Sequence, residues 1–221
     1  MSGKLTALRS MTNKQMQAIG SDLSYGPIVI GSVLHREIIV REFQAKYNLS
    51  VDGYPGDKTY FALWSAGHRP TTREAIISQA RDWCNIGTTY DLGSGGYEWL
   101  PDFPATESDC SGFIASVLGR SRKPQPDFPY WLSTDSIWTD CADKQRLFKE
   151  IVQPVEGCLV VYPDSGGRQG HVGIVTGVEN DWIEGIDCSS STKGDAVTER
   201  NLTFFLSKPN VRFCLPAWLQ K

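Results

Sequence analysis

The sequence predicts an α+β fold in which helices come first and an antiparallel sheet follows. Apolar residues recur at helical spacing as far as Leu118. From Cys158 onward the pattern changes to short β-rich runs, each bounded by glycine, proline or aspartate. Because the two kinds of segment follow one another rather than alternating, we expect the helices to pack on an antiparallel sheet.

The composition is typical of a globular protein. The 221 residues are 40% hydrophobic and 21% charged, and no stretch approaches the roughly 20 consecutive apolar residues of a membrane span. A net charge of -3 leaves no basic stripe that could follow a phosphate backbone. We therefore expect neither nucleic acid nor a membrane as partner. We also expect the protein to be a monomer. Lys4 and Arg9 precede no apolar run, so we expect no secretory signal and synthesis in a cytoplasm.

The N-terminal part of the chain is predicted to be helical. Helices are expected over residues 13–23 and 35–47. A glycine-rich turn over residues 51–56 then leads to a short helix over residues 58–64, with Asp57 as its N-cap. Helix, turn and helix form the local plan.

A polar, turn-rich linker over residues 65–72 indicates two domains, residues 1–68 and residues 69–221. The second domain is predicted to begin with a helix over residues 73–83. A long loop rich in glycine and proline follows over residues 87–107. A loop of this length is usually either functional or disordered.

Strands are predicted in the second half of the second domain. Three β-rich runs cover residues 158–162, 171–176 and 182–188. Residues 204–205 and 211–215 supply one or two further strands. This part of the chain therefore provides the sheet of the α+β fold.

Cys110 is the candidate nucleophile. It stands in the run D-C-S-G-F at 109–113, where a predicted helix begins. A helix N-terminus favours the thiolate, which is the reactive form of cysteine. Asp109 and Ser111 suit the cap, and Gly112 lets a substrate backbone come close. A buried cysteine in a first helical turn would show the same pattern.

His171 is the candidate general base. It is the only one of the three histidines that lies beyond the linker, and it opens the strand predicted over residues 171–176. The glycine-rich turn before it leaves the ring accessible. A surface histidine without function would look the same, but a helix-capping cysteine together with a strand-edge histidine indicates a Cys/His pair.

A third polar group is expected to orient the imidazole by accepting its other N–H. If the hairpin after His171 turns about Glu179, then Asp187 faces His171 and Glu184 points to the other side. A tighter turn about residues 177–178 would bring Glu184 opposite His171 instead. Asp187 is preferred and Glu184 is second, and both could simply be solvated carboxylates at strand ends.

The six cysteines lie far apart and include no C-x-x-C pair. A reduced compartment is the simpler interpretation, with most of the thiols acting as small buried apolar groups. Their spacing supports a zinc site poorly. We expect no metal and no cofactor.

Three sequence blocks follow one another in the second domain: D-C-S-G-F at 109–113, G-C-L-V-V-Y at 157–162 and G-H-V-G-I-V at 170–175. In this order they resemble the signature blocks of NlpC-like cell-wall peptidases. The related CHAP amidases use the same pair of residue types, a cysteine and a histidine. The resemblance covers roughly residues 72–200 and implies a papain-like domain, with Cys110 as nucleophile and His171 as general base.

The resemblance also indicates two further site residues, Asp187 and Tyr90. Asp187 stands in the segment where the family places its third polar residue, which is often a histidine there. Tyr90 resembles the tyrosine that lies near the oxyanion region in the family. Here the glycines that normally follow this tyrosine are displaced to residues 93–96, and the loop to Cys110 is longer.

The first domain resembles the repeat of a small helical peptidoglycan-binding domain. The matching features are V-R-E-F-Q at 40–44, Leu49, Asp52-Gly53, Gly56 and Thr59. A helical cap that only supports the second domain would give the same pattern.

Together the two resemblances imply a peptidoglycan hydrolase that cleaves an amide bond of the stem peptide, as a cysteine endopeptidase or an N-acetylmuramoyl-L-alanine amidase. A wall-binding domain joined to such an enzyme is the plan of a bacteriophage endolysin, made in the host cytoplasm and acting in the periplasm or cell wall. The alternatives are a secreted interbacterial amidase toxin, a tail-associated lysin, a catalytically silent wall-binding protein and a thiol acyltransferase.

Overall fold

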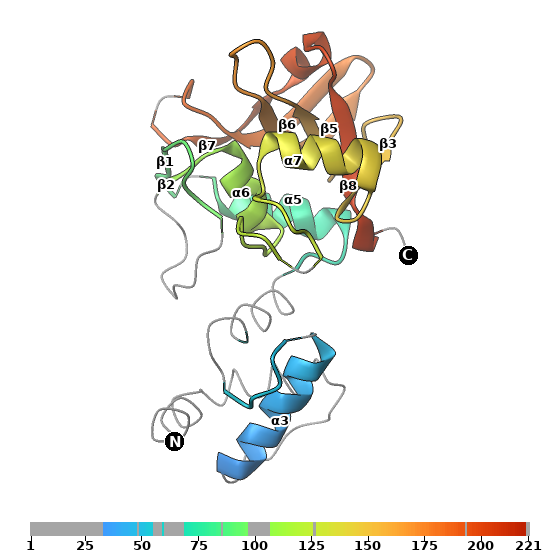
Figure 1. Ribbon diagram of the computed structural model, residues 1–221. Helices are drawn as coiled ribbons and strands as arrows, with labels where there is room; N and C mark the ends of the chain where they lie inside the picture. Colours follow the sequence, from blue (N-terminus) through green and yellow to red (C-terminus); the bar gives the residue numbers. More distant parts are fainter. Residues whose placement is uncertain are drawn as a thin grey trace. The chain divides into compact units, whose positions relative to one another are not determined.

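The computed structural model describes residues 33–47, 49–54, 59, 69–84, 86–96, 107–125, 127–192 and 194–219 (Figure 1). The chain divides into two compact units, Met1–His68 and Arg69–Lys221, so the division lies within the predicted linker. The helix predicted over residues 13–23 lies outside the described residues. So does the helix predicted over 58–64, apart from Thr59, which is helical.

In the first unit, helix α3 (Val33–Lys46) confirms the helix predicted over residues 35–47. It buries Ile39, Val40 and Phe43. The Gln44 side chain is also buried, donating to the Asp52 carboxylate over 2.9 Å and accepting from the Gly53 N–H over 2.8 Å. These bonds hold the turn after the helix against α3.

The second unit is built on a six-stranded sheet, and every neighbouring pair of strands in it is antiparallel. The strand order is β3-β8-β4-β5-β6-β7. The strands are β3 (Phe148–Ile151), β4 (Leu159–Tyr162), β5 (His171–Glu179), β6 (Trp182–Cys188), β7 (Val197–Asn201) and β8 (Arg212–Pro216). Helices packed on such a sheet confirm the predicted α+β class.

The helices of the second unit are mostly short. A two-stranded parallel pair, β1 (Thr89–Tyr90) with β2 (Glu107–Ser108), lies next to the start of α6. The helices are α5 (Arg73–Asp82), α6 (Cys110–Val117), α7 (Thr134–Thr139), the π-helix η1 (Asp140–Lys144) and the 3₁₀ helices η2 (Thr203–Ser207) and η3 (Ala217–Leu219). None of the helices in the described part of the chain is long and apolar enough to cross a membrane.

The core lies on both faces of the sheet. Every residue of α6 is buried, because its sequence is apolar or small all round. Helices α5 and α6 lie on one face of the sheet (Figure 1). They pack against alternate sheet residues such as Val172 and Ile174. The other face carries a second cluster that includes Val160, Leu202 and Phe205. The sheet thus holds the N-terminus of α6 and the start of β5 in fixed positions.

The structure departs from the predicted elements in two places. Phe204 and Phe205 lie in η2 rather than in a strand, so only β8 forms from the two candidate segments at the C-terminal end. Strands β1 and β2, which lie at the two ends of the predicted loop, strands β3 and β7, and the helical segments α7–η1 and η3 were not predicted. These elements are short or lack a clear apolar period, so their sequences carry little local signal.

Candidate active site

Cys110 is the first residue of α6. Asp109 caps this helix, and its carboxylate accepts the Gly112 N–H over 2.7 Å. The Asp109 N–H donates to the Ser94 carbonyl, and the Phe113 N–H donates to the Asp109 carbonyl. Within the described part of the chain, the N–H groups of Cys110 and Ser111 are the first-turn donors left without an acceptor. Two free amide donors therefore lie beside the Cys110 thiol.

His171 opens β5, and its ring contacts an acid, a thiol and an aromatic wall. Its Nε2 lies 2.6 Å from Oδ2 of Asp187, which leaves Nδ1 as the ring nitrogen for Cys110. Burial lowers the pKa of His171, but hydrogen bonds to Asp187 and to Cys110 outweigh it and raise that pKa to about 9. The ring stacks on Phe205 with centroids 5.5 Å apart. The imidazolium is thus the favoured form at neutral pH.

Asp187 is fully buried on β6 and has two cationic neighbours. Arg200 binds it through both Nε, at 2.8 Å, and Nη2, at 2.7 Å. Burial raises the pKa of Asp187, whereas the hydrogen bonds from His171 and Arg200 lower it, and the net effect is a pKa below the usual value. Asp187 therefore remains a carboxylate, which favours the charged form of His171.

The register of the hairpin differs from both predicted registers. Asp187 faces Gly173 rather than His171, because the chain turns after Glu179 paired with Trp182 and the ladder shifts between Val175 and Gly177. His171 and Asp187 are therefore diagonal neighbours on the same face. A Cβ on Gly173 would lie 3.3 Å from the Asp187 Cβ, so the missing side chain leaves the diagonal open.

Glu184 does not reach the site. It is exposed and pairs with Gly177, on the turn side of the irregularity. Residues three apart on a strand point to opposite faces, so Glu184 and Asp187 cannot both approach His171. The tighter turn that would have placed Glu184 opposite His171 is wrong.

Tyr90 lies close to Cys110. It is on β1, paired with Ser108, two residues before Cys110 in the chain. Burial raises the pKa of Tyr90, and the nearby Cys110 raises it further. The hydroxyl therefore stays protonated, as a donor near the candidate nucleophile.

Gly112 makes room for a neighbouring loop, whereas the sequence predicted that it would make room for a substrate backbone. A Cβ there would lie 2.3 Å from the Ser94 carbonyl oxygen and 2.9 Å from the Gly95 Cα. The close partner of Gly112 is thus the loop over residues 93–96, not a substrate. This loop is the displaced glycine segment that follows Tyr90.

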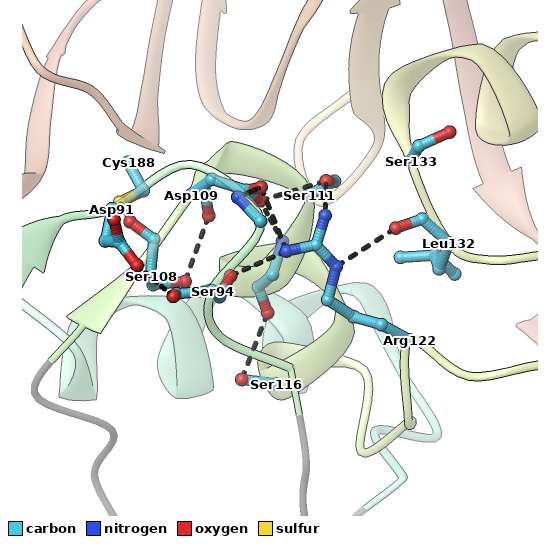
Figure 2. A network of polar contacts seen from close by, with 12 residues as sticks. Asp91, Ser94, Ser108, Asp109, Ser111, Ser116, Arg122, Leu132, Ser133 and Cys188 are labelled. Atoms are coloured by element: carbon cyan, nitrogen blue, oxygen red, sulfur yellow. Dashed lines mark hydrogen bonds and ion pairs between the residues drawn. The ribbon is translucent and has the colours of Figure 1, made fainter.

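Two arginines of the site were missed by sequence reasoning. Arg200 fixes Asp187, and Arg122 binds the carboxylate of Asp109 (Figure 2). Each is separated from its partner by 13 residues, and no local pattern marks the pairing. One feature of the sequence could have indicated Arg122: Asp109 stands next to the proposed thiolate, and two neighbouring negative charges require a nearby cation.

None of the six cysteines forms a disulfide bond, and most of the thiols are buried. Burial raises the pKa of Cys84, Cys188 and Cys214, and it raises that of Cys158 to about 12. Among the described residues, no group of three or more His, Cys, Asp or Glu side chains is arranged to hold a metal ion.

A family match covers the segment in which these residues lie. Residues 101–189 match the model described as the CHAP domain. Residues 101–189 are thus similar to the CHAP domain. This segment includes Cys110, His171 and Asp187, and a CHAP domain is papain-like, in agreement with the predicted fold. Its general function is that of a peptidoglycan hydrolase, either amidase or peptidase. Comparison with curated proteins and with solved structures gave no significant match.

Proposed function

We propose that the protein hydrolyses an amide bond in the peptidoglycan stem peptide by nucleophilic catalysis, with Cys110 as nucleophile, His171 as base and Asp187 as orienting residue. The contact of His171 with both Cys110 and Asp187, inside the CHAP segment, is the observation that carries this proposal. A buried structural histidine would need one partner, whereas here one ring joins a thiol to a carboxylate.

In the proposed mechanism, the Cys110 thiolate and the protonated His171 form the resting ion pair, and the thiolate attacks the carbonyl carbon of the substrate. The N–H groups of Cys110 and Ser111 donate to the resulting oxyanion. His171 then protonates the leaving amine as the C–N bond breaks. A water molecule, deprotonated by His171, attacks the thioester and releases the carboxylic acid together with the free thiol.

Tyr90 is proposed to assist the same oxyanion. Its raised pKa keeps the phenol as a hydrogen-bond donor, and it lies near Cys110. We expect Tyr90→Phe to lower kcat for the release of peptidoglycan fragments and to change KM little, since the donor would act in the transition state. An unchanged kcat in this variant would remove Tyr90 from the mechanism.

Replacement of the nucleophile tests the reaction type. Cys110→Ala is expected to abolish the hydrolysis of purified peptidoglycan while leaving the far-UV circular dichroism and the binding to the wall intact. Cys84→Ala is the matched control, because Cys84 is the least buried of the six thiols and lies outside the site. A folded Cys110→Ala protein that still releases fragments would refute the proposal.

We also propose that the protein acts as a bacteriophage endolysin, made in a bacterial cytoplasm and acting in the cell wall, with the unit of residues 1–68 binding peptidoglycan. Both an amidase and an endopeptidase agree with the site. Mass spectrometry of the released fragments separates them. An amidase yields free stem peptides with an N-terminal alanine, and an endopeptidase yields shortened peptides still attached to the sugar.

A further inference from the structure

We propose that Arg122 is a positioning residue for the nucleophile: it neutralises the Asp109 carboxylate next to Cys110 and holds the loop over residues 93–96 against the first turn of α6. The inference rests on the proposed function, because it concerns the same thiol. It adds a fourth residue, Arg122, on which the reactivity of Cys110 depends besides His171 and Asp187.

The pair of Asp109 and Arg122 is buried. Nη1 of Arg122 lies 2.9 Å from Oδ2 of Asp109, and the two side chains are only 5% and 4% exposed. Asp109 precedes Cys110 directly, so its charge is one residue from the thiol. A buried charge without a partner is costly, and truncation of one member of such a pair leaves the other uncompensated.

Arg122 joins three separate segments at this point (Figure 2). Its Nη1 donates to the Ser94 carbonyl over 2.6 Å, and Nη2 donates to the Ser111 hydroxyl over 2.8 Å. Its Nε donates to the Leu132 carbonyl over 3.2 Å. The guanidinium thus ties the loop over residues 93–96 to the same helical turn that carries Cys110 and its two free amides.

The charge next to Cys110 decides how easily its thiolate forms. A like charge within a few Å disfavours an anion, and an opposite charge favours it. Four groups act on Cys110 from the sheets: Tyr90 on β1, Tyr162 on β4, His171 on β5 and Cys188 on β6. Burial raises the pKa of both tyrosines and of Cys188, so these three stay neutral near pH 7.

Of the described groups named here, His171, Asp109 and Arg122 carry a charge next to Cys110 or its helical turn. Asp109 also accepts hydrogen bonds from the N–H groups of Gly93 and Gly112, so its carboxylate is needed in the structure. Arg122 makes this cap compatible with a neighbouring thiolate. Without Arg122, the same carboxylate would oppose ionisation of Cys110.

Arg120 offers a matched control. It is as buried as Arg122, at 3% exposure, and binds the Asp127 carboxylate through two bonds of 2.8 and 2.7 Å. Its carboxylate partner is not adjacent to the nucleophile. Loss of Arg120 therefore also removes a buried, ion-paired guanidinium but should leave the reactivity of Cys110 unchanged.

The test is the rate of iodoacetamide alkylation at Cys110 between pH 5 and 10, read by mass spectrometry of the full-length protein. Arg122→Met is expected to slow alkylation at pH 7 on the order of tenfold and to move the profile to higher pH, since a tenfold change corresponds to one pKa unit. Arg122→Lys should recover part of the rate. Asp109→Asn, which keeps a good N-cap, should react at least as fast as the wild type.

The double variant Asp109→Asn/Arg122→Met separates charge from packing. We expect it to react close to the wild-type rate, because both charges are gone. The inference is overturned if Arg122→Met is no slower than Arg120→Met, or if the double variant is as slow as Arg122→Met. If Arg122→Met does not fold, the comparison of Asp109→Asn with the wild type decides, and slower alkylation of Asp109→Asn overturns the inference.

Alkylation does not depend on turnover, so the outcome is independent of the proposed hydrolysis. If the Cys110→Ala protein still degraded peptidoglycan, the proposed function would fail, but the alkylation profiles would still test whether Arg122 controls the reactivity of Cys110. If the profiles were insensitive to Arg122 but Cys110→Ala was inactive, only the role of Arg122 would be lost.

Discussion

At the scale of single residues, His171 owes its charge state to two opposing effects. Burial alone would make the neutral ring the stable form, as for any histidine removed from water. Asp187, held by Arg200, and the Cys110 thiol reverse this preference. The result is a histidine suited to hold a proton close to a thiolate, which is the resting state that a cysteine hydrolase requires.

The pH dependence of activity follows from this balance. If the protonated ring is the active form, kcat/KM should fall as pH rises through about 9 in the wild type. Asp187→Asn removes the largest raising influence, so the alkaline limb should move to lower pH. Glu184→Gln is the control, because this exposed carboxylate lies on the other face of β6 and should leave the limb in place. An alkaline limb that is the same in Asp187→Asn and the wild type would contradict this role of Asp187.

The same shift predicts a pH-dependent contribution to stability. The folded-state pKa of His171 lies above its ordinary value of 6.5, so folding stabilises the protonated form. This contribution is fully present below pH 6.5 and is lost as pH rises through about 9. The difference in free energy of unfolding between the wild type and His171→Gln, measured by urea denaturation, should therefore shrink between pH 6 and pH 10. A difference that grows over this range would contradict the assigned direction.

At the scale of elements, the hairpin β5–β6 sets the geometry of the acid and the base. The shift in the ladder between Val175 and Gly177 places Asp187 opposite Gly173, and the missing side chain at Gly173 opens the diagonal path to His171. A Cβ at this position would also lie 2.9 Å from the Leu202 Cδ1. Gly173 therefore matters for packing and for the site together.

Gly173→Ala is predicted to lower the free energy of unfolding by about 1–3 kcal/mol, as is usual for overpacking, and to reduce activity by displacing Asp187. Gly177→Ala is the matched control on the same strand, because a Cβ there would meet Glu184 at an ordinary 3.6 Å. Urea denaturation and the hydrolysis of purified peptidoglycan measure both effects. Equal free energies of unfolding for the two variants would contradict this prediction, because they would show that the neighbours of Gly173 can accommodate a Cβ without destabilising the fold.

The elements show which features can be predicted from sequence. The start of α6 at Cys110 and the strand from His171 were predictable, because a cap residue and an apolar period are local signals. The diagonal contact of His171 with Asp187 was not, since a one-residue irregularity inside the hairpin changes every pairing beyond it. Arg122 and Arg200 were out of reach for the same reason: their partners become neighbours only after the chain has folded.

At the scale of the whole molecule, the two units are proposed to divide binding from chemistry. The CHAP match lies within the second unit, and the unit of residues 1–68 carries the peptidoglycan-binding resemblance. Cys110→Ala protein should sediment with purified peptidoglycan. A fragment of residues 69–221 with the same substitution, shown to be folded by circular dichroism, should sediment at least several-fold less. Equal sedimentation of the two would assign wall binding to the second unit.

The central claim is that Cys110 is the nucleophile, and the most direct measurement follows alkylation and activity in one sample. The full-length protein is treated with limiting iodoacetamide near pH 7, and the fraction of Cys110 modified is determined by mass spectrometry of its peptides. Activity on purified peptidoglycan is measured in parallel. We predict that Cys110 is modified first among the six cysteines and that activity falls in proportion to its modification. Full activity in a protein whose Cys110 is completely alkylated would contradict the claim.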